Sequence, residues 1–316
     1  MFNSKISLLC LLFASVSSVG SVGRRAYAAG AAGAPEIFYQ PAAGGRTISI
    51  EAFSLTPPPQ VSYTAAAVPL YSIESNMNGY GARFAYGLTE RWATHVFAAT
   101  ESQTHKLTDQ YGSVTRKASG LRDLECKLTN LTALGSWLLH ITVGVTLSPD
   151  KQTEATVTKD GNINSGGTGI VNALGLSTQV GSANYWGIKL SYLTNLEKTA
   201  NVNSPGAQDY KITGGNKTSV RTFFEADFTE FGIDLSLGYD FMDPVLKKYS
   251  TGSRINDDAY QVMMVTGGMQ LQFLGTYNAR VEYESSIVGA RNYPTAGIQA
   301  PSHARSTLTF RLRYEF

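Results

Sequence analysis

The most constraining feature of the sequence is the alternation in its last thirteen residues, 304–316, ARSTLTFRLRYEF. Large apolar side chains fall on one parity, from Leu308 to the terminal Phe316, and Thr, Arg and Glu side chains fall on the other. A period of two places successive side chains on opposite faces of a strand. This stretch therefore predicts a terminal β-strand with one apolar face and one polar face.

Three further segments, residues 137–147, 220–228 and 231–241, show the same alternation. Strands of a soluble sandwich alternate in this way, and so do those of a transmembrane β-barrel, which face lipid on one side and a polar interior on the other. The terminal strand ends on an aromatic residue, and in this it resembles the C-terminal signal strand of bacterial outer-membrane barrels. No apolar run in the sequence is long enough for a membrane helix.

Along the chain, short connections between the predicted strands alternate with long ones. Short turns are predicted at 88–90, 132–136, 182–184, 230–231 and 275–276, and long polar loops at 102–118, 149–166, 197–218, 243–257 and 290–303. Outer-membrane barrels have short periplasmic turns and long external loops. The predicted strands begin near Thr47, Asn78, Arg91, Ser119, Trp137, Gly167, Tyr185, Ser219, Gly232, Ala259, Tyr277 and Arg305. We therefore predict an all-β fold, a closed antiparallel transmembrane barrel of about twelve strands with both termini in the periplasm.

Two details bear on this topology. Residues 61–75 are compatible with a loop, an extension of the second strand, or a hairpin that changes the strand count. The tryptophans Trp92, Trp137 and Trp186 all follow short turns, where they would form an aromatic girdle on the periplasmic side.

The N-terminus has the pattern of a secretory signal peptide. Lys5 precedes a short apolar run, and Ala26-Tyr27-Ala28 offers a cleavage site between small residues. We assign residues 1–28 to the signal peptide, 29–45 to a periplasmic leader or short plug, and 46–316 to the barrel. Loss of the signal peptide changes the formal net charge from +2 to −1, which does not favour nucleic acid as a partner. It also leaves Cys126 without a second cysteine for an internal disulfide.

Four segments resemble a known family. They are YGLTERW (Tyr86–Trp92), SGLRDLECKL (Ser119–Leu128), YWGIKLSY (Tyr185–Tyr192) and the closing RLRYEF. These segments are similar to the outer-membrane proteins named after the meta-pathway of phenol degradation, although Arg122 stands where that family has Gly. The resemblance implies a barrel of this size that passes small, often hydrophobic or aromatic, compounds, and it implies no catalytic residues.

Charged residues and histidines of the predicted strands fall mainly on the polar parity. Placing Arg or Lys on the lipid side near the midplane costs about 2–4 kcal/mol, so we expect these side chains to face the lumen, the interior of the barrel. The candidates for lining it are Glu51, Arg83, His95, Asp123, Glu125, Lys127, His140, Lys189, Arg221, Glu225, Asp227, Asp234, Asp240, Arg280, Glu282, Glu284, Arg311 and Arg313. In one interpretation they select permeants by charge. In the other they pair across the barrel, stiffen it and partly fill it.

Enzymatic and metal-binding functions find little support. His95, His105, His140 and His303 lie in no nucleophile motif, and the sequence contains no HExxH or CxxC. The run that begins at Asp160 imitates a calcium loop but lacks its central Gly and its final Glu. We therefore predict no catalytic residues, cofactor or metal site.

The expected function is passage of small solutes by diffusion across a Gram-negative outer membrane, and the resemblance implies that hydrophobic or aromatic compounds are among them. The expected partners are outer-membrane lipid, the solute itself, and the barrel-assembly machinery, which would recognise the C-terminal strand. The alternative is a plugged structural or surface-interaction barrel that binds a partner through its external loops.

Overall fold

The structure is a computed structural model that describes residues 36–56, 60–64, 69–181, 184–202, 209–228, 231–293 and 298–316. The predicted signal peptide lies outside the described residues. Among them, no helix has the length and apolar character to cross a membrane.

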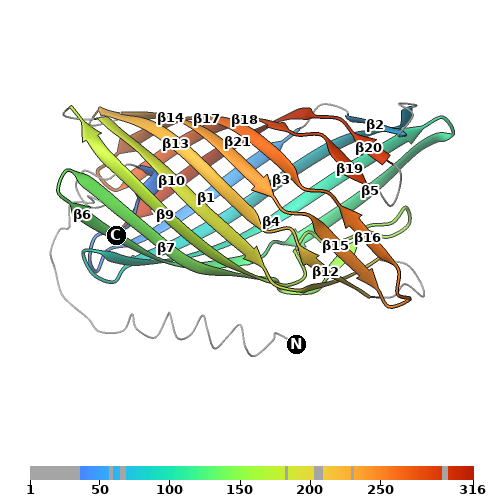
Figure 1. Ribbon diagram of the computed structural model, residues 1–316. Coiled ribbons are helices and arrows are strands. Elements are labelled where there is room, and N and C mark those ends of the chain that lie inside the picture. The colour runs from blue at the N-terminus through green and yellow to red at the C-terminus, as the bar shows by residue number, and fades with distance from the viewer. Residues whose placement is uncertain are drawn as a thin grey trace.

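Twelve long strands form a closed cylinder (Figure 1). They are β1 (Arg46–Leu55), β3 (Pro69–Gly87), β4 (Trp92–Asp109), β6 (Leu124–Leu134), β7 (Trp137–Leu147), β9 (Thr168–Val180), β10 (Asn184–Asn195), β13 (Lys217–Phe228), β14 (Phe231–Met242), β17 (Tyr260–Phe273), β18 (Tyr277–Val288) and β21 (His303–Glu315). Each pairs antiparallel with its neighbours, and β1 pairs with both β3 and β21. Closure leaves no strand edge within the cylinder, as a membrane-spanning sheet requires. The structure confirms the predicted transmembrane barrel of twelve strands.

The two ends of the barrel differ. At the short-turn end, where the C-terminus also lies, tight turns join β3 to β4, β6 to β7 and β17 to β18 (Figure 1). The opposite, long-loop end carries additional strands. Four of these extend the barrel sheet: β2 (Gln60–Thr64), β5 (Gly112–Leu121), β19 (Arg291–Tyr293) and β20 (Ile298–Ala300). Five others form a separate sheet: β8 (Gln152–Glu154), β11 (Lys198–Val202), β12 (Tyr210–Gly214), β15 (Val245–Tyr249) and β16 (Arg254–Asp257).

The long polar stretches are therefore not simple loops, contrary to the sequence-based prediction. The β4–β5 hairpin shows why, since its ladder continues without interruption from Thr100 opposite Leu121 to Asp109 opposite Gly112. Polar residues can form strands because the backbone supplies the ladder hydrogen bonds. In the uncertain segment at 61–75, residues from Pro69 onward extend the second barrel strand, β3, and β2 pairs with this extension, with Gln60 opposite Ile73, so the count of twelve barrel strands does not change.

The strand predicted to start at Ser119 is interrupted. Ser119 and Leu121 belong to the end of β5, and β6 starts only at Leu124. Gly120 has a φ of +136°, a backbone conformation that other residues rarely adopt, and this allows the chain to leave the ladder. Asp123, a predicted lining residue, therefore lies between two strands.

The outward face of the barrel is apolar. On β14 the side chains of Ile233, Leu235 and Leu237 are about half exposed, whereas Ser236 and Asp240 of the other parity are buried. Comparable rows on the other long strands form a band of exposed large hydrophobics, as a lipid-facing surface requires. Trp92 and Trp137 are the first residues of β4 and β7, which places them at the short-turn end as predicted.

We expect Leu235→Arg to lower the free energy of unfolding of the barrel in phospholipid vesicles by about 2–4 kcal/mol. Leu235 lies midway along the apolar row of β14 and is 53% exposed, so the arginine would enter the hydrocarbon. Urea titration of refolded protein measures the change. Leu196→Arg is the matched control, because Leu196 is also exposed but follows the end of β10 at the long-loop end. Equal losses in the two variants would contradict a lipid-facing role for the band.

Candidate functional site

The N-terminal segment Glu36–Gln40 lies within the lumen, and its central residue is Phe38. The Phe38 ring has no exposed surface. It stacks on the imidazole of His140, with ring centroids 4.7 Å apart, and meets the Phe223 ring edge-on at 5.3 Å. The wall beneath Phe38 is Gly175 of β9, where a Cβ atom would lie 2.4 Å from the Phe38 ring. A larger residue in place of Gly175 would therefore occupy the space that the Phe38 ring now fills.

Polar contacts fix the rest of the segment. The Glu36 carboxylate accepts a hydrogen bond from Arg313 Nη1 at 2.7 Å, and its backbone N–H donates to both carboxylate oxygens of Glu225 at 3.0 and 2.8 Å. The Tyr39 hydroxyl donates to Glu315 at 2.9 Å, and the Arg313 guanidinium lies 3.7 Å from the Tyr39 ring centroid. These contacts join the segment to β13 and β21, which lie apart in the barrel wall.

Glu36 precedes the first strand and is held as a carboxylate. Burial acts to raise its pKa, but the positive charges of Arg313 and Arg280 outweigh burial and hold the pKa below its usual value. Gln40 is also buried, and its amide oxygen accepts a hydrogen bond from the Thr129 hydroxyl at 3.3 Å. Every polar side chain of Glu36–Gln40 therefore has a partner on the barrel wall.

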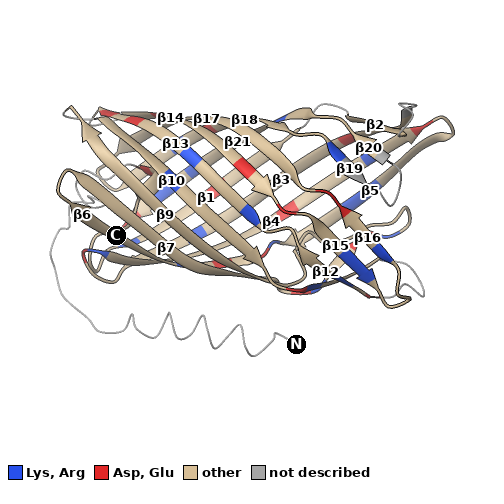
Figure 2. Cartoon of the chain, in the orientation of Figure 1, with Lys and Arg blue, Asp and Glu red and all other residues tan. Residues whose placement is uncertain are grey.

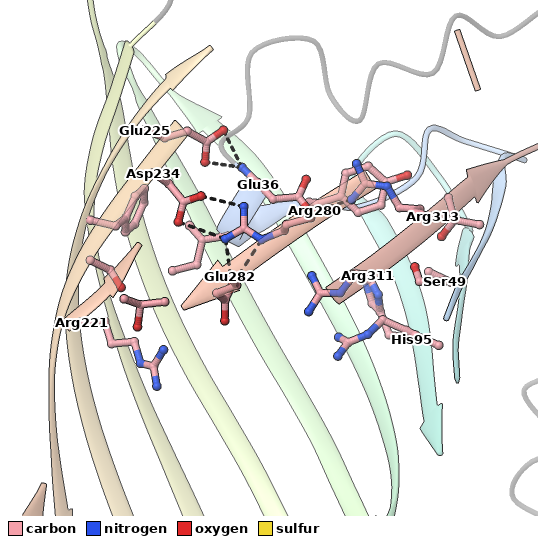
Figure 3. Close-up of a pocket in the computed structure, with 18 residues that line it drawn as sticks. Glu36, Ser49, His95, Arg221, Glu225, Asp234, Arg280, Glu282, Arg311 and Arg313 are labelled. Carbon is pink, nitrogen blue, oxygen red and sulfur yellow. Dashed lines mark hydrogen bonds and ion pairs between the residues drawn. The ribbon is translucent and has the colours of Figure 1, made fainter. Parts of the chain in front are cut away.

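A dense ion cluster lies next to this segment (Figure 3). Arg280 of β18 binds Asp234 of β14 through two hydrogen bonds of 2.7 and 3.0 Å, and it binds Glu282 at 2.9 Å. The Arg280–Asp234 pair passes over the intervening strand β17 at Gly268, where a Cβ would lie 2.3 Å from an Asp234 oxygen. Bidentate pairs of this kind are the stronger and more directional ion pairs.

Between the N-terminal segment and the wall lies a cavity of about 230 Å³. Its titratable lining residues are Glu36, Arg83, His95, Arg221, Glu225, Asp234, Arg280, Glu282, Arg311 and Arg313. Phe223, Ile37 and Ala85 supply apolar surface, and Ser49, Ser236 and Thr266 supply hydroxyl groups. The cavity thus offers both a charged and an apolar surface to a small molecule.

The predicted lining residues have different positions. Those that line the cavity are Arg83, His95, Arg221, Glu225, Asp234, Arg280, Glu282, Arg311 and Arg313. Four others pair with neighbours inside the barrel: Glu51 with Arg311, Glu284 with Arg221, and Glu125 with Lys127. His140 stacks on Phe38, and Lys189 Nζ lies 5.9 Å from the centroid of the same ring. Charged residues are also spread along the rest of the barrel and over the β15–β16 hairpin (Figure 2).

Three predicted residues lie away from the cavity. Asp240 pairs with Lys217, near the long-loop end of β13 and β14. Asp123 accepts hydrogen bonds from the Ser148 hydroxyl and the Ser165 backbone, and thereby ties the β5–β6 connection to the connection after β7. Asp227 is exposed near the short-turn end of β13.

The sequence predicts a periplasmic leader or short plug at residues 29–45, but it singles out none of their side chains as site residues. Glu36, Tyr39 and Gln40 were not among the candidates, since they precede the first alternating strand. Their signal is compositional, because EIFYQ interrupts a leader that otherwise consists of Ala, Gly and Pro. Glu101 of β4 was also missed; it is buried and lies 3.5 Å from Arg122.

Within the described ranges, no three His, Cys, Asp or Glu side chains are grouped as metal ligands. His95 hydrogen-bonds the Thr129 hydroxyl at 3.1 Å, and His105 bonds Ser75 at 2.8 Å. The arrangement is one of charge pairs and of the segment Glu36–Gln40 around a cavity.

Comparison with known proteins bears on the fold. No family model and no curated protein matches the sequence. The structure of an outer membrane channel from Pseudomonas putida F1 aligns with 90% of this chain and 99% of its own, at 12% identity and a TM-score of 0.57. The deltaS2 mutant of the TodX monoaromatic hydrocarbon channel aligns with 89% of this chain and 92% of its own, at 11% identity and a TM-score of 0.51. The chain therefore has the fold of these two channel proteins.

Proposed function

We propose that the protein is a channel of the Gram-negative outer membrane that passes small solutes, hydrophobic and aromatic ones included, by diffusion. The observation that carries this proposal is a closed barrel, apolar outside and charged inside, whose lumen retains a cavity of about 230 Å³ beside the N-terminal segment. Two solved structures with the same fold are named as channels, one of them for monoaromatic hydrocarbons. The sequence resemblance to the meta-pathway family points in the same direction.

The solute would enter at the long-loop end, pass the charged lumen and leave at the short-turn end. The residues that obstruct this route are Glu36–Gln40, so we assign the leader 29–45 the role of a plug. The contacts of Phe38 with His140 and of Glu36 with Arg313 support a segment that is bound to the barrel wall. A plug held by a few contacts makes passage dependent on its displacement.

Export and assembly follow from the two ends of the chain. Residues 1–28 would direct export as a signal peptide, and the C-terminal strand β21 would present its terminal aromatic to the barrel-assembly machinery. The partners in the membrane are then outer-membrane lipid and the solute. We assign the protein a transport role and no enzymatic activity, in line with the channel proteins whose fold it shares.

A second candidate is a plugged surface-interaction barrel. The observation in its favour is the five-stranded sheet β16-β15-β12-β11-β8 at the long-loop end, which exceeds what a pore needs. Deleting strands of this sheet would abolish a surface-binding function and leave flux unchanged. If the protein is a channel, substitutions in the lumen would change flux, whereas deletion of these strands would not.

Single-channel recording of the refolded mature protein in a planar bilayer tests the channel proposal. We expect discrete conductance steps, and we expect Arg311→Ser to lower the ratio of anion to cation permeability, because a positive charge leaves the pathway. Arg116→Ser, on the exposed β5 strand, is the control and should leave this ratio unchanged. A folded, heat-modifiable barrel that stays silent for ions and for aromatic solutes would refute the proposal.

A further inference from the structure

Three arginines of the cavity have donors to spare. Arg83 forms no ion pair within the described part of the chain, and its Nε atom is buried without a hydrogen-bond partner. Among the described residues, Arg311 pairs only through Nε, at 3.1 Å from Glu51. Arg221 makes one distant ion pair, at 3.9 Å from Glu284, and its Nη2 atom contacts the sulfur of Met264. Arginine guanidiniums seldom lack acceptors when they are enclosed.

The acids that line the same cavity are already engaged. Asp234 and Glu282 both bind Arg280, and Glu36 binds Arg313. Glu225 accepts both hydrogen bonds from the backbone of Glu36. The partnered acids therefore leave unused guanidinium N–H groups on Arg83, Arg221 and Arg311, which all line this cavity.

We propose that this cavity binds a small organic carboxylate between the guanidinium groups of Arg83, Arg221 and Arg311. Arg221 and Arg311 border the open space from either side in Figure 3. The planar fork of a guanidinium matches the two oxygens of a carboxylate. Phe223 and Ile37 line the cavity as well and would cover an apolar ring attached to that carboxylate. The inference rests on the proposed channel function, because it names the class of solute that the lumen accepts.

The test is calorimetric titration of the refolded barrel with benzoate, and with benzamide as a neutral ligand of the same shape. We expect benzoate to bind at least tenfold more tightly than benzamide. Arg83→Gln should weaken benzoate binding about tenfold and leave benzamide unaffected, because a charge-assisted hydrogen bond is lost. Arg116→Gln, on the exposed β5 strand, carries the same substitution outside the cavity and should bind as the parent does. Should Arg83→Gln fail to refold, Arg221→Gln serves the same purpose.

Equal affinity for benzoate and benzamide, or unchanged benzoate binding in a folded Arg83→Gln barrel, would overturn the carboxylate site. Swelling of proteoliposomes in benzamide and in benzoate then separates this inference from the channel proposal. Flux of both solutes without discrimination leaves the channel standing and removes the site. Tight benzoate binding with no flux of either solute removes the channel and leaves the site.

Discussion

Phe38→Ala is expected to raise the fraction of time that the channel spends open by a large factor. The substitution deletes the only fully buried aromatic ring of Glu36–Gln40, together with its contacts to His140 and Phe223. Truncating a buried Phe to Ala costs about 3–5 kcal/mol, which corresponds to a shift of about 100-fold or more between docked and undocked segments. Long bilayer recordings of parent and variant at one voltage measure the open fraction directly.

A substitution in the barrel wall can also displace the Phe38 ring and so tests whether the segment Glu36–Gln40 gates the pore. Gly175→Val would place a side chain where the Phe38 ring now lies, since even a Cβ would approach this ring to 2.4 Å. It should therefore reproduce the effect of Phe38→Ala. Gly267→Val on β17 is the matched control, because a Cβ there meets no atom within 4 Å. An unchanged open fraction in both Phe38→Ala and Gly175→Val would mean that Glu36–Gln40 does not gate the pore.

The barrel itself could be predicted from the sequence because its period of two is imposed by lipid. Every second residue of rows such as Phe231–Phe241 must be apolar to face the membrane, so the pattern records the environment directly. The long-loop end has no such constraint. Polar strands such as β5 face water on both sides, and their sequences resemble loops although they pair regularly.

The site could be predicted only in part, for a related reason. Parity indicates on which face Arg280 and Asp234 lie, but not that they meet, since they are separated by 46 residues and by the whole of β17. Their approach depends on the absence of a side chain at Gly268, and a single sequence does not distinguish this glycine from those in turns. Docking of Phe38 depends in the same way on Gly175.

Arg280→Met is expected to lower the free energy of unfolding of the barrel by about 3–5 kcal/mol. The Arg280 side chain is 7% exposed and pairs with both Asp234 and Glu282, so its removal leaves two neighbouring carboxylates without this cation. Urea titration of protein refolded in vesicles measures the loss. Asp234→Leu combined with Arg280→Met should cost less than the sum of the two single changes, with a coupling energy of about 1–3 kcal/mol, because the double variant leaves neither partner of this pair uncompensated.

An exposed pair sets the baseline for this cycle. Lys211 and Glu197 lie 2.7 Å apart at the long-loop end, with side chains 60% and 51% exposed, and Lys211→Met should change the free energy of unfolding by less than about 1 kcal/mol. The chemical change is comparable, a long cation replaced by Met, so the difference between the two variants isolates the effect of enclosure in the lumen. Equal costs would mean that water solvates Asp234 and Glu282 as freely as a surface carboxylate. In that case the ion cluster would border an open aqueous path, and its pairs would not hold the wall together.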